Sequence, residues 1–251
     1  MTGVQTCALP IFVDQSPLAI SMPTLYLENF QNAEDYYDHA LQGGWLRFFR
    51  VCLHWIGLLL PALYLALVSF NQEFLPVSLL MPIARARDAM PFSAFVEVLM
   101  VQFIISLILQ AQARVPKLYG NALGIFSGVV VGQALLIANL ASPTTMIVMT
   151  IATLAHNLTP QLQLTNRVLS LMLTIVSGFF GLYGLMLGTV MLIAYLMNKT
   201  SLGVPFMAPY APMIASDLKD GFGKFKSISK FFKRPYSIPS KDKIRQAPHK
   251  K

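Results

Sequence analysis

Long apolar runs with almost no charge dominate this chain and leave few folds open to it. Residues 51–70 and 121–140 each supply about the 20 residues that a spanning helix needs. Residues 91–111 form a third run of this length, interrupted by a single carboxylate. Residues 168–197 form a run of about 30, which must tilt, bend or extend beyond the bilayer. Residues 144–158 are short for a full crossing unless they are buried or re-entrant.

The composition supports the same class of protein. Hydrophobic residues make up 55% of the chain and charged residues only 12%, which is too apolar for a soluble domain of 251 residues. We therefore expect an all-α polytopic membrane protein with about four spanning helices, one short or re-entrant segment and interfacial helices. Cys7 and Cys52 lie in unrelated settings and predict neither a disulfide nor a metal site.

Basic residues near the runs predict the orientation in the membrane. Arg47 and Arg50 precede the run at residues 51–70, and Arg114 and Lys117 follow the run at residues 91–111. Residues 217–251 hold eleven basic and three acidic residues, so they account for the whole net charge of +8. Loops rich in Lys and Arg stay in the cytoplasm. Four spans with one partial segment keep all three groups there, including the C-terminal tail, whereas five full crossings would export the tail.

Glycine and proline predict where the helices break. Gly43 and Gly44 should interrupt a helix that approaches the membrane before residue 51. Pro61 should kink the first spanning helix and free a backbone carbonyl. Residues 71–90 contain two prolines and a basic cluster, so we expect an interfacial segment there, on the outer side of the membrane.

Glu97 is the carboxylate inside the run at residues 91–111, and a charge buried in a membrane helix is a functional-site hypothesis. Gln102 and Ser106 fall on roughly the same side of the helix, which makes a polar stripe. One interpretation is a candidate pore, in which Glu97 repeats around an oligomer and attracts cations. The other is structural: Glu97 pairs with Arg87 or Arg114, or it caps a helix start. The residues leave both open.

Glycines at three- and four-residue spacing predict close contacts between helices. One set forms a doubled GxxxG pattern, which lets two backbones approach each other. The other lies in the middle of the longest run. The predicted helix-packing residues are Gly124, Gly128, Gly132, Gly181, Gly184 and Gly188.

The basic tail predicts a contact with anionic lipids. Apolar residues recur there every three or four positions between basic ones, as in an amphipathic helix on a membrane surface. The predicted membrane-surface residues are Lys224, Lys226, Lys230, Lys233 and Arg234. A disordered basic tail is the alternative. We expect no nucleic-acid binding, because the tail must lie beside lipid.

The sequence predicts no enzyme. The histidines, His39, His54, His156 and His249, share no metal-ligand spacing, and the chain has no zinc-protease motif, phosphate-binding loop or nucleophile elbow. We therefore expect no catalytic residue, no metal and no cofactor.

Residues 1–11, MTGVQTCALPI, resemble the translation of a sequencing adapter and lack the basic region and long apolar core of a signal peptide. We expect an artefactual leader and a chain whose natural N-terminus is missing. An ordinary disordered start is the alternative.

Several strings, in order along the chain, resemble one family. They are AEDYYDHAL (33–41), LLLPALYLALVSF (58–70), ARDAMPFSAFVE (86–97), VGQALL (131–136), GLYGLMLG (181–188), GVPFMAPYAP (203–212) and DLKD (217–220). Together they resemble the membrane region of the A subunit of spore germinant receptors, the GerA family of spore germination proteins. The resemblance covers residues 29–220.

The resemblance implies an organisation and a function. Residues 12–50 would be a connector and juxtamembrane helix left from a missing soluble domain, 51–200 the transmembrane domain, 201–220 a proline-rich loop with the DLKD motif, and 221–251 the basic cytoplasmic tail. The family implies a nutrient-sensing, multi-pass protein of the spore inner membrane, with a transporter-like B subunit and a lipoprotein C subunit as partners. It also implies a homo-oligomeric ring that conducts monovalent cations and triggers germination.

The chain departs from the family pattern at the polar stripe. Gln102, Ser106 and Gln110 stand where the family tends to carry further acids, and Ser93 replaces a proline. These departures weaken a role of the stripe in ion selection. Two alternative functions are a related stage V sporulation subunit that assists ion or dipicolinate release, and a secondary transporter. A transporter would usually show a repeated half, and we find none.

Overall fold

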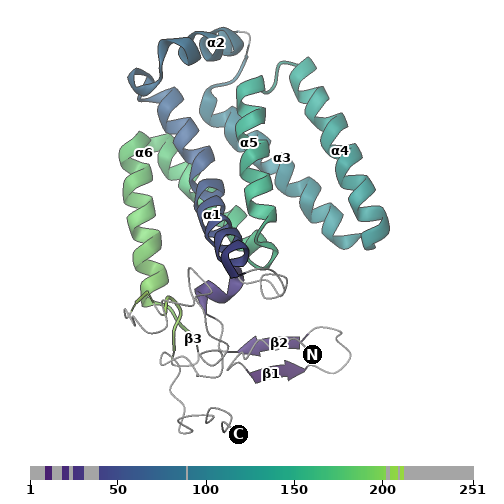
Figure 1. Cartoon of the computed structure of the whole chain (residues 1–251). Helices are drawn as coiled ribbons and strands as arrows, with labels where there is room; N and C mark the ends of the chain where they lie inside the picture. The colour runs from purple at the N-terminus through teal and green to yellow at the C-terminus, as the bar shows by residue number, and fades with distance from the viewer. Residues whose placement is uncertain are drawn as a thin grey trace, which may run out of the picture. The chain divides into compact units, whose positions relative to one another are not determined.

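The computed structural model describes residues 9–12, 19–22, 25–30, 40–88, 90–201, 204–208 and 210–211, and this part is mostly helical (Figure 1). Its α-helices are α1 (Ala40–Ser69), α2 (Val77–Asp88), α3 (Ala94–Arg114), α4 (Lys117–Ile137), α5 (Pro143–Asn157) and α6 (Gln163–Asn198). Its 3-10 helices are η1 (Tyr26–Phe30), η3 (Gln72–Phe74) and η4 (Pro160–Leu162). Two antiparallel pairs of strands join β1 (Leu9–Phe12) to β2 (Ala19–Met22) and β3 (Thr200–Ser201) to β4 (Val204–Pro205).

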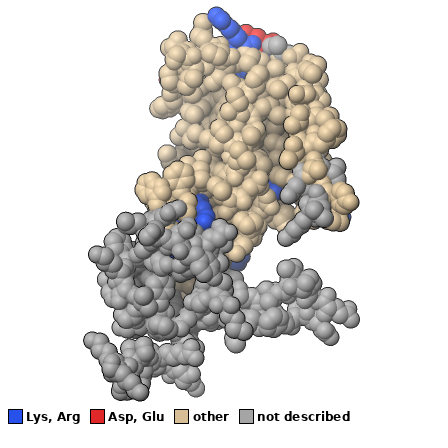
Figure 2. Space-filling model, turned by 45° about the vertical axis from the view of Figure 1, so that its right-hand side comes forward, with Lys and Arg blue, Asp and Glu red and all other residues tan. Residues whose placement is uncertain are grey.

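The predicted all-α polytopic membrane fold is confirmed. Among the described residues, the segments Gly43–Ser69, Ala94–Arg114 and Pro160–Asn198 are helices long and apolar enough to cross a membrane, and Gly124–Ile137 is a shorter apolar helix. Figure 2 shows one face on which charged atoms gather at the upper end, where α2 lies in Figure 1, with a broad uncharged band below. Such a band suits contact with lipid.

The chain divides into two compact units, 1–52 with 191–251 and 53–190. In the described part of the first unit, η1 packs on the turn after β4. The backbone N–H of Tyr26 donates to the carbonyl of Phe206 at 2.9 Å, and the ammonium of Lys199 lies 5.7 Å from the centre of the Phe206 ring. Burial raises the pKa of Glu28 in this packing. The second unit holds α2 to α5, residues 53–69 of α1 and residues 163–190 of α6.

Helix α1 corrects one expectation. Gly43 and Gly44 do not interrupt it, because α1 is continuous from Ala40 to Ser69. A glycine inside a helix costs only about 1 kcal/mol, which the need to pair every backbone group near lipid outweighs. Pro61 lies inside α1 and cannot donate to the carbonyl of Gly57, four residues earlier. The ring of His156 from α5 lies against Gly57 and interacts with its backbone.

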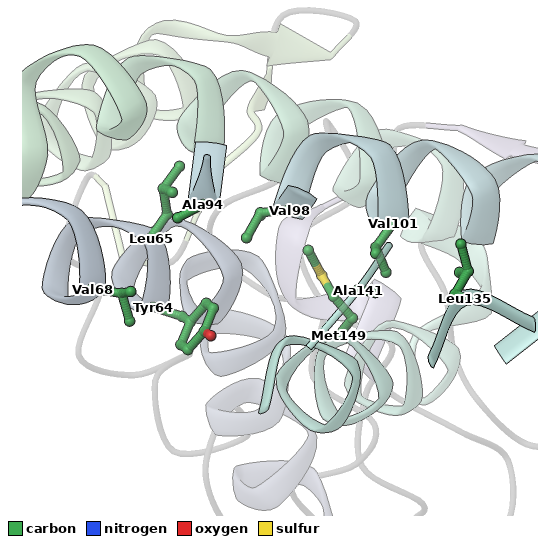
Figure 3. Packing of buried hydrophobic residues seen from close by; sticks show 9 residues of the cluster. All are labelled: Tyr64, Leu65, Val68, Ala94, Val98, Val101, Leu135, Ala141 and Met149. Carbon is green, nitrogen blue, oxygen red and sulfur yellow. The ribbon is translucent and has the colours of Figure 1, made fainter. Parts of the chain in front are cut away.

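Helices α1, α3 and α5 meet in the core (Figure 3). Leu65 of α1 and Val98 and Val101 of α3 are completely buried there, and Met149 of α5 packs among them. Inside a bilayer, lipid tails are as apolar as these side chains, so close packing and hydrogen bonds hold the helices together rather than burial from water.

Helix α6 is a hairpin of two limbs that meet at Gly181. This residue has φ 62° and ψ −143°, which is not helical. A Cβ added at Gly188 would lie 2.8 Å from Leu173 Cδ2, whereas residues 15 apart in one straight helix are about 22 Å apart. Figure 1 shows the two limbs descending from a common upper end. The long apolar run therefore bends back on itself. A Cβ added at Gly184 would also lie only 2.7 Å from the carbonyl oxygen of Val176.

At one end of the second unit, the end of α1, the start of α3 and the bend of α6 lie close together. Phe70, just after α1, lies against Gly181 at the bend of α6, and Phe95 at the start of α3 lies against Gly178. Helix α2 crosses this end (Figure 1), as an interfacial helix would. The end of α3 with Arg114 lies at the opposite end, as does the start of α4. Helix α5 has 15 residues, about 22 Å, and matches the predicted short segment.

Candidate functional site

Glu97 lies in the first turn of α3 and is only 1% exposed. Its Oε1 accepts a hydrogen bond of 2.6 Å from the backbone N–H of Ser142. Ser142 is the N-cap of α5, so the carboxylate holds the start of a different helix. Of the two structural alternatives, this hydrogen bond supports helix capping rather than a pair with arginine, but the capped helix is α5 and not the helix that carries Glu97.

The electrostatics at this helix start favour a carboxylate. The first turn of a helix carries about half a positive charge on its free N–H groups. Helix α5 has no acidic residue of its own in that turn, so Glu97 supplies the negative charge from α3. Its second oxygen, Oε2, is buried and has no hydrogen-bond partner among the described residues. The site therefore stabilises the carboxylate through one strong contact and the helix dipole.

Four hydroxyl groups complete this site, which we name the α5 N-cap cluster (Tyr64, Glu97, Ser142, Thr144 and Thr145). Ser142 Oγ accepts from the backbone N–H of Thr145 at 3.3 Å, which is the usual N-cap bond. The Tyr64 hydroxyl from α1 lies 3.1 Å from Oγ1 of both Thr144 and Thr145. The cluster thus ties α1, α3 and α5 together through buried polar contacts.

The rest of the predicted stripe also faces protein. Gln102 is 9% exposed, and its Nε2 donates to Ser170 Oγ of α6 at 3.1 Å. Ser106 is half-buried and donates to the carbonyl of Gln102 in its own helix at 2.7 Å. A cavity of about 30 Å³ lies beside Gln102, Ser106 and Arg167. The structure therefore brings Glu97, Gln102 and Ser106 to the inner side of α3, while Gln110 is exposed.

A second buried polar contact joins α1 to α6. Asn166 Nδ2 lies 3.1 Å from His54 Nδ1 and 3.4 Å from Thr159 Oγ1. His54, Thr159 and Asn166 are all nearly inaccessible to solvent. Sequence reasoning missed this set, because its members are far apart in the chain. The signal that could have found it is a polar residue within one apolar run, His54, and another just before the longest run, Asn166.

The glycines of α4 are used unequally. A Cβ added at Gly124 would collide with the amide of Gln112 from α3, and one at Gly132 would lie 3.5 Å from Met146 Cε of α5. A Cβ at Gly128 would meet nothing within 4 Å. Gly128, the middle glycine of the α4 pattern, therefore has no packing partner within the described chain. The basic tail residues, Lys224, Lys226, Lys230, Lys233 and Arg234, lie outside the described residues.

The fold and its buried polar contacts define a multi-pass helical membrane protein with no group of three metal-ligating side chains among the described residues. The family model described as Bacillus/Clostridium GerA spore germination protein matches residues 8–237. The chain therefore belongs to the GerA family, which confirms the resemblance seen in the sequence. No solved structure matches the chain.

Two of its relatives show how much of the family protein is present. The spore germination protein GerLA of Bacillus cereus is 37% identical over 235 residues, which cover 92% of this chain and 47% of that protein. The spore germination protein KA of Bacillus subtilis is 34% identical over 238 residues, 94% of this chain and 44% of that protein. The chain thus spans about half the length of the curated relatives it matches.

Proposed function

We propose that this chain is the membrane region of the A subunit of a spore germinant receptor. It oligomerises in the spore inner membrane and forms a channel for monovalent cations that opens when a nutrient is sensed. The observation that carries the proposal is the family match over residues 8–237, since the relatives are spore germination proteins. Its partners in this proposal are a transporter-like B subunit, a lipoprotein C subunit and anionic lipids at the basic tail.

The surface of α4 supports self-association. Ile125, Phe126 and Val129 are more than half exposed, and the space beside Gly128 is open. Small residues at membrane-helix contacts let backbones approach closely. Helix α4 is therefore the surface on which a second copy of the chain can pack.

The positions of the basic residues support the orientation. Arg114 and Lys117 lie at the end of the bundle away from α2. Because α6 is a hairpin, it crosses the membrane twice in this proposal instead of once. Its second limb therefore returns toward the end of the bundle where Arg114 lies. In our proposal this end faces the cytoplasm, together with the C-terminal tail, and α2 faces the outer side.

The role of Glu97 in the channel stays a prediction. Its burial and its bond to Ser142 support the capping role, in which the carboxylate sets the position of α5. Conductance of the Glu97→Gln variant in the intact receptor decides between the roles. A changed ion selectivity in Glu97→Gln supports the pore charge, whereas an unchanged selectivity in Glu97→Gln together with impaired assembly in Glu97→Ala supports the cap.

Gly128 offers the test of self-association. Gly128→Leu adds a side chain in open space, so it should leave the subunit folded and block the approach of a second α4. Ala134→Leu is the matched control, because Ala134 is exposed on a different face of α4. We expect Gly128→Leu to reduce the oligomer in chemical crosslinking within membranes. An oligomer equally abundant in both variants contradicts packing through α4.

A further inference from the structure

A cavity of about 560 Å³ lies under α2 in the second unit. Its lining comes from the end of α1, the η3 turn, α2, the start of α3 and Gly178 beside the bend of α6. Sites for small molecules typically measure about 300 to 1,000 Å³ and combine an apolar wall with a few polar groups. The cavity has the size and the mixed lining of such a site.

The inner face of α2 lines this cavity. Leu80, Ile83, Ala84 and Arg87 are spaced at three, four and seven residues, so they share one face of the helix. The apolar face of an amphipathic helix normally packs on its protein. None of the residues of α2, all of which are described, is buried. Ile83 packs against the edge of the core, and the rest of this face adjoins the cavity.

Two neighbouring charges of opposite sign give the cavity its chemistry. Arg87 and Asp88 both line it. A guanidinium binds a phosphate or carboxylate through paired hydrogen bonds, and a carboxylate accepts hydrogen bonds from an ammonium group. Phe95, Leu80 and Ile83 provide apolar wall beside these charges. This combination matches a molecule that has an anionic group and an ammonium group next to an apolar part.

The place of the cavity in the fold agrees with such a ligand. Helix α2 lies across the ends of the apolar helices (Figure 1), and Figure 2 shows charge gathered at that end above the uncharged band. An amphiphile at this boundary keeps its charged groups beside Arg87 and Asp88 and its apolar part among the helices. A membrane lipid and a free zwitterion share this chemistry.

We propose that this cavity binds a zwitterionic amphiphile, with its anionic group on Arg87, its ammonium group on Asp88 and its apolar part against Phe95. The ligand fills the space between α2 and the ends of α1 and α3. The cavity also touches Gly178, beside the bend of α6. An occupant therefore contacts both α2 and the region where the two limbs of α6 meet. This inference is independent of the proposed channel.

The test compares two sources of the ligand on the full chain. For a lipid, native mass spectrometry measures which lipid stays bound after release from nanodiscs of equal parts phosphatidylethanolamine, phosphatidylcholine and phosphatidylglycerol. Only the first carries both a phosphate and an ammonium that donates hydrogen bonds. For a free zwitterion, binding of radiolabelled L-leucine to the detergent-solubilised chain is measured. Selective retention of phosphatidylethanolamine identifies the lipid source, and saturable leucine binding identifies the free one.

Matched variants decide whether the cavity holds the ligand. Arg87→Gln and Asp88→Asn should each weaken the binding about tenfold, as expected for loss of a charge-assisted hydrogen bond. Arg85→Gln is the control, because Arg85 is exposed on the same helix and does not line the cavity. Equal binding by all three variants overturns the proposal, and so does the lack of both selective lipid retention and leucine binding.

A second pair of variants tests the space itself. Ala84→Phe places a ring in the cavity and leaves both charges intact, so it should abolish binding. Ser78→Phe adds the same ring on the opposite face of α2, at an exposed residue that does not line the cavity, and should bind as the wild type does. Binding retained by Ala84→Phe contradicts the assignment.

Discussion

Replacement of Glu97 separates its capping role from a charge role. Glu97→Gln keeps an oxygen that can accept from the Ser142 N–H, whereas Glu97→Ala leaves that N–H without its partner. Ser142 is completely buried, so the lost partner is not replaced by water. The two variants therefore predict different losses of stability.

The magnitudes follow from the 2.6 Å bond between Glu97 Oε1 and the Ser142 N–H. Glu97→Gln loses the negative charge at the start of α5, which is worth about 1 kcal/mol at a helix terminus. Glu97→Ala loses the hydrogen bond, about 1 to 3 kcal/mol for a buried donor left unpaired, and also opens a cavity. We expect a total of about 3 to 5 kcal/mol for this variant.

The assay is reversible unfolding of the full chain in mixed micelles, titrated with a denaturing detergent. Glu73→Gln is the control, because Glu73 is an exposed acid of η3 and should change the stability by less than about 0.5 kcal/mol. Hydrogen exchange at the Ser142 amide should also rise more in Glu97→Ala than in Glu97→Gln. A loss in Glu97→Ala as small as that in Glu73→Gln would refute the capping role.

Three further predictions concern other contacts. Gly181→Ala should destabilise the chain by about 1 to 3 kcal/mol, because its φ of 62° with ψ of −143° disfavours a side chain; thermal unfolding measures this, and Gly128→Ala, in open space, should cause no loss. A double-mutant cycle of His54→Phe and Asn166→Leu should give a coupling of about 1 kcal/mol, and additive effects would contradict their 3.1 Å contact. Burial raises the pKa of Glu28, so the packing of η1 should be most stable below the pKa of Glu28 in the unfolded chain and should weaken as the pH rises through its pKa in the folded chain. Hydrogen exchange of η1 measured against pH tests this. The Glu28→Gln variant should lose the pH dependence.

The helices themselves could be predicted from the sequence because membrane helices depend on local properties. A run of about 20 apolar residues is sufficient to predict a span, and the Ser142–Pro143 pair marks the start of α5 with an N-cap and a helix-starting proline. The bend at Gly181 could not be located, because four glycines lie in that run and only the packing of the two limbs selects one of them.

The candidate site could be predicted only in part. The sequence identifies Glu97 as a costly charge, but its partner Ser142 lies 45 residues away. No local sequence pattern predicts this contact, because the turn between α4 and α5 brings Ser142 to Glu97. The same holds for the contact of His54 with Asn166, 112 residues apart. Gly57 was missed as well: only the approach of His156 shows why a small residue stands four positions before Pro61.

The central claim is that this subunit assembles through α4 into a cation-conducting receptor. The most direct measurement is the monovalent cation current of the intact receptor, with full-length A subunit and its B and C subunits, in planar bilayers before and after nutrient addition. We predict a nutrient-dependent current that Gly128→Leu abolishes and Ala134→Leu preserves. A current of the same size in the Gly128→Leu receptor, or no nutrient-dependent current in the wild type, would contradict the account.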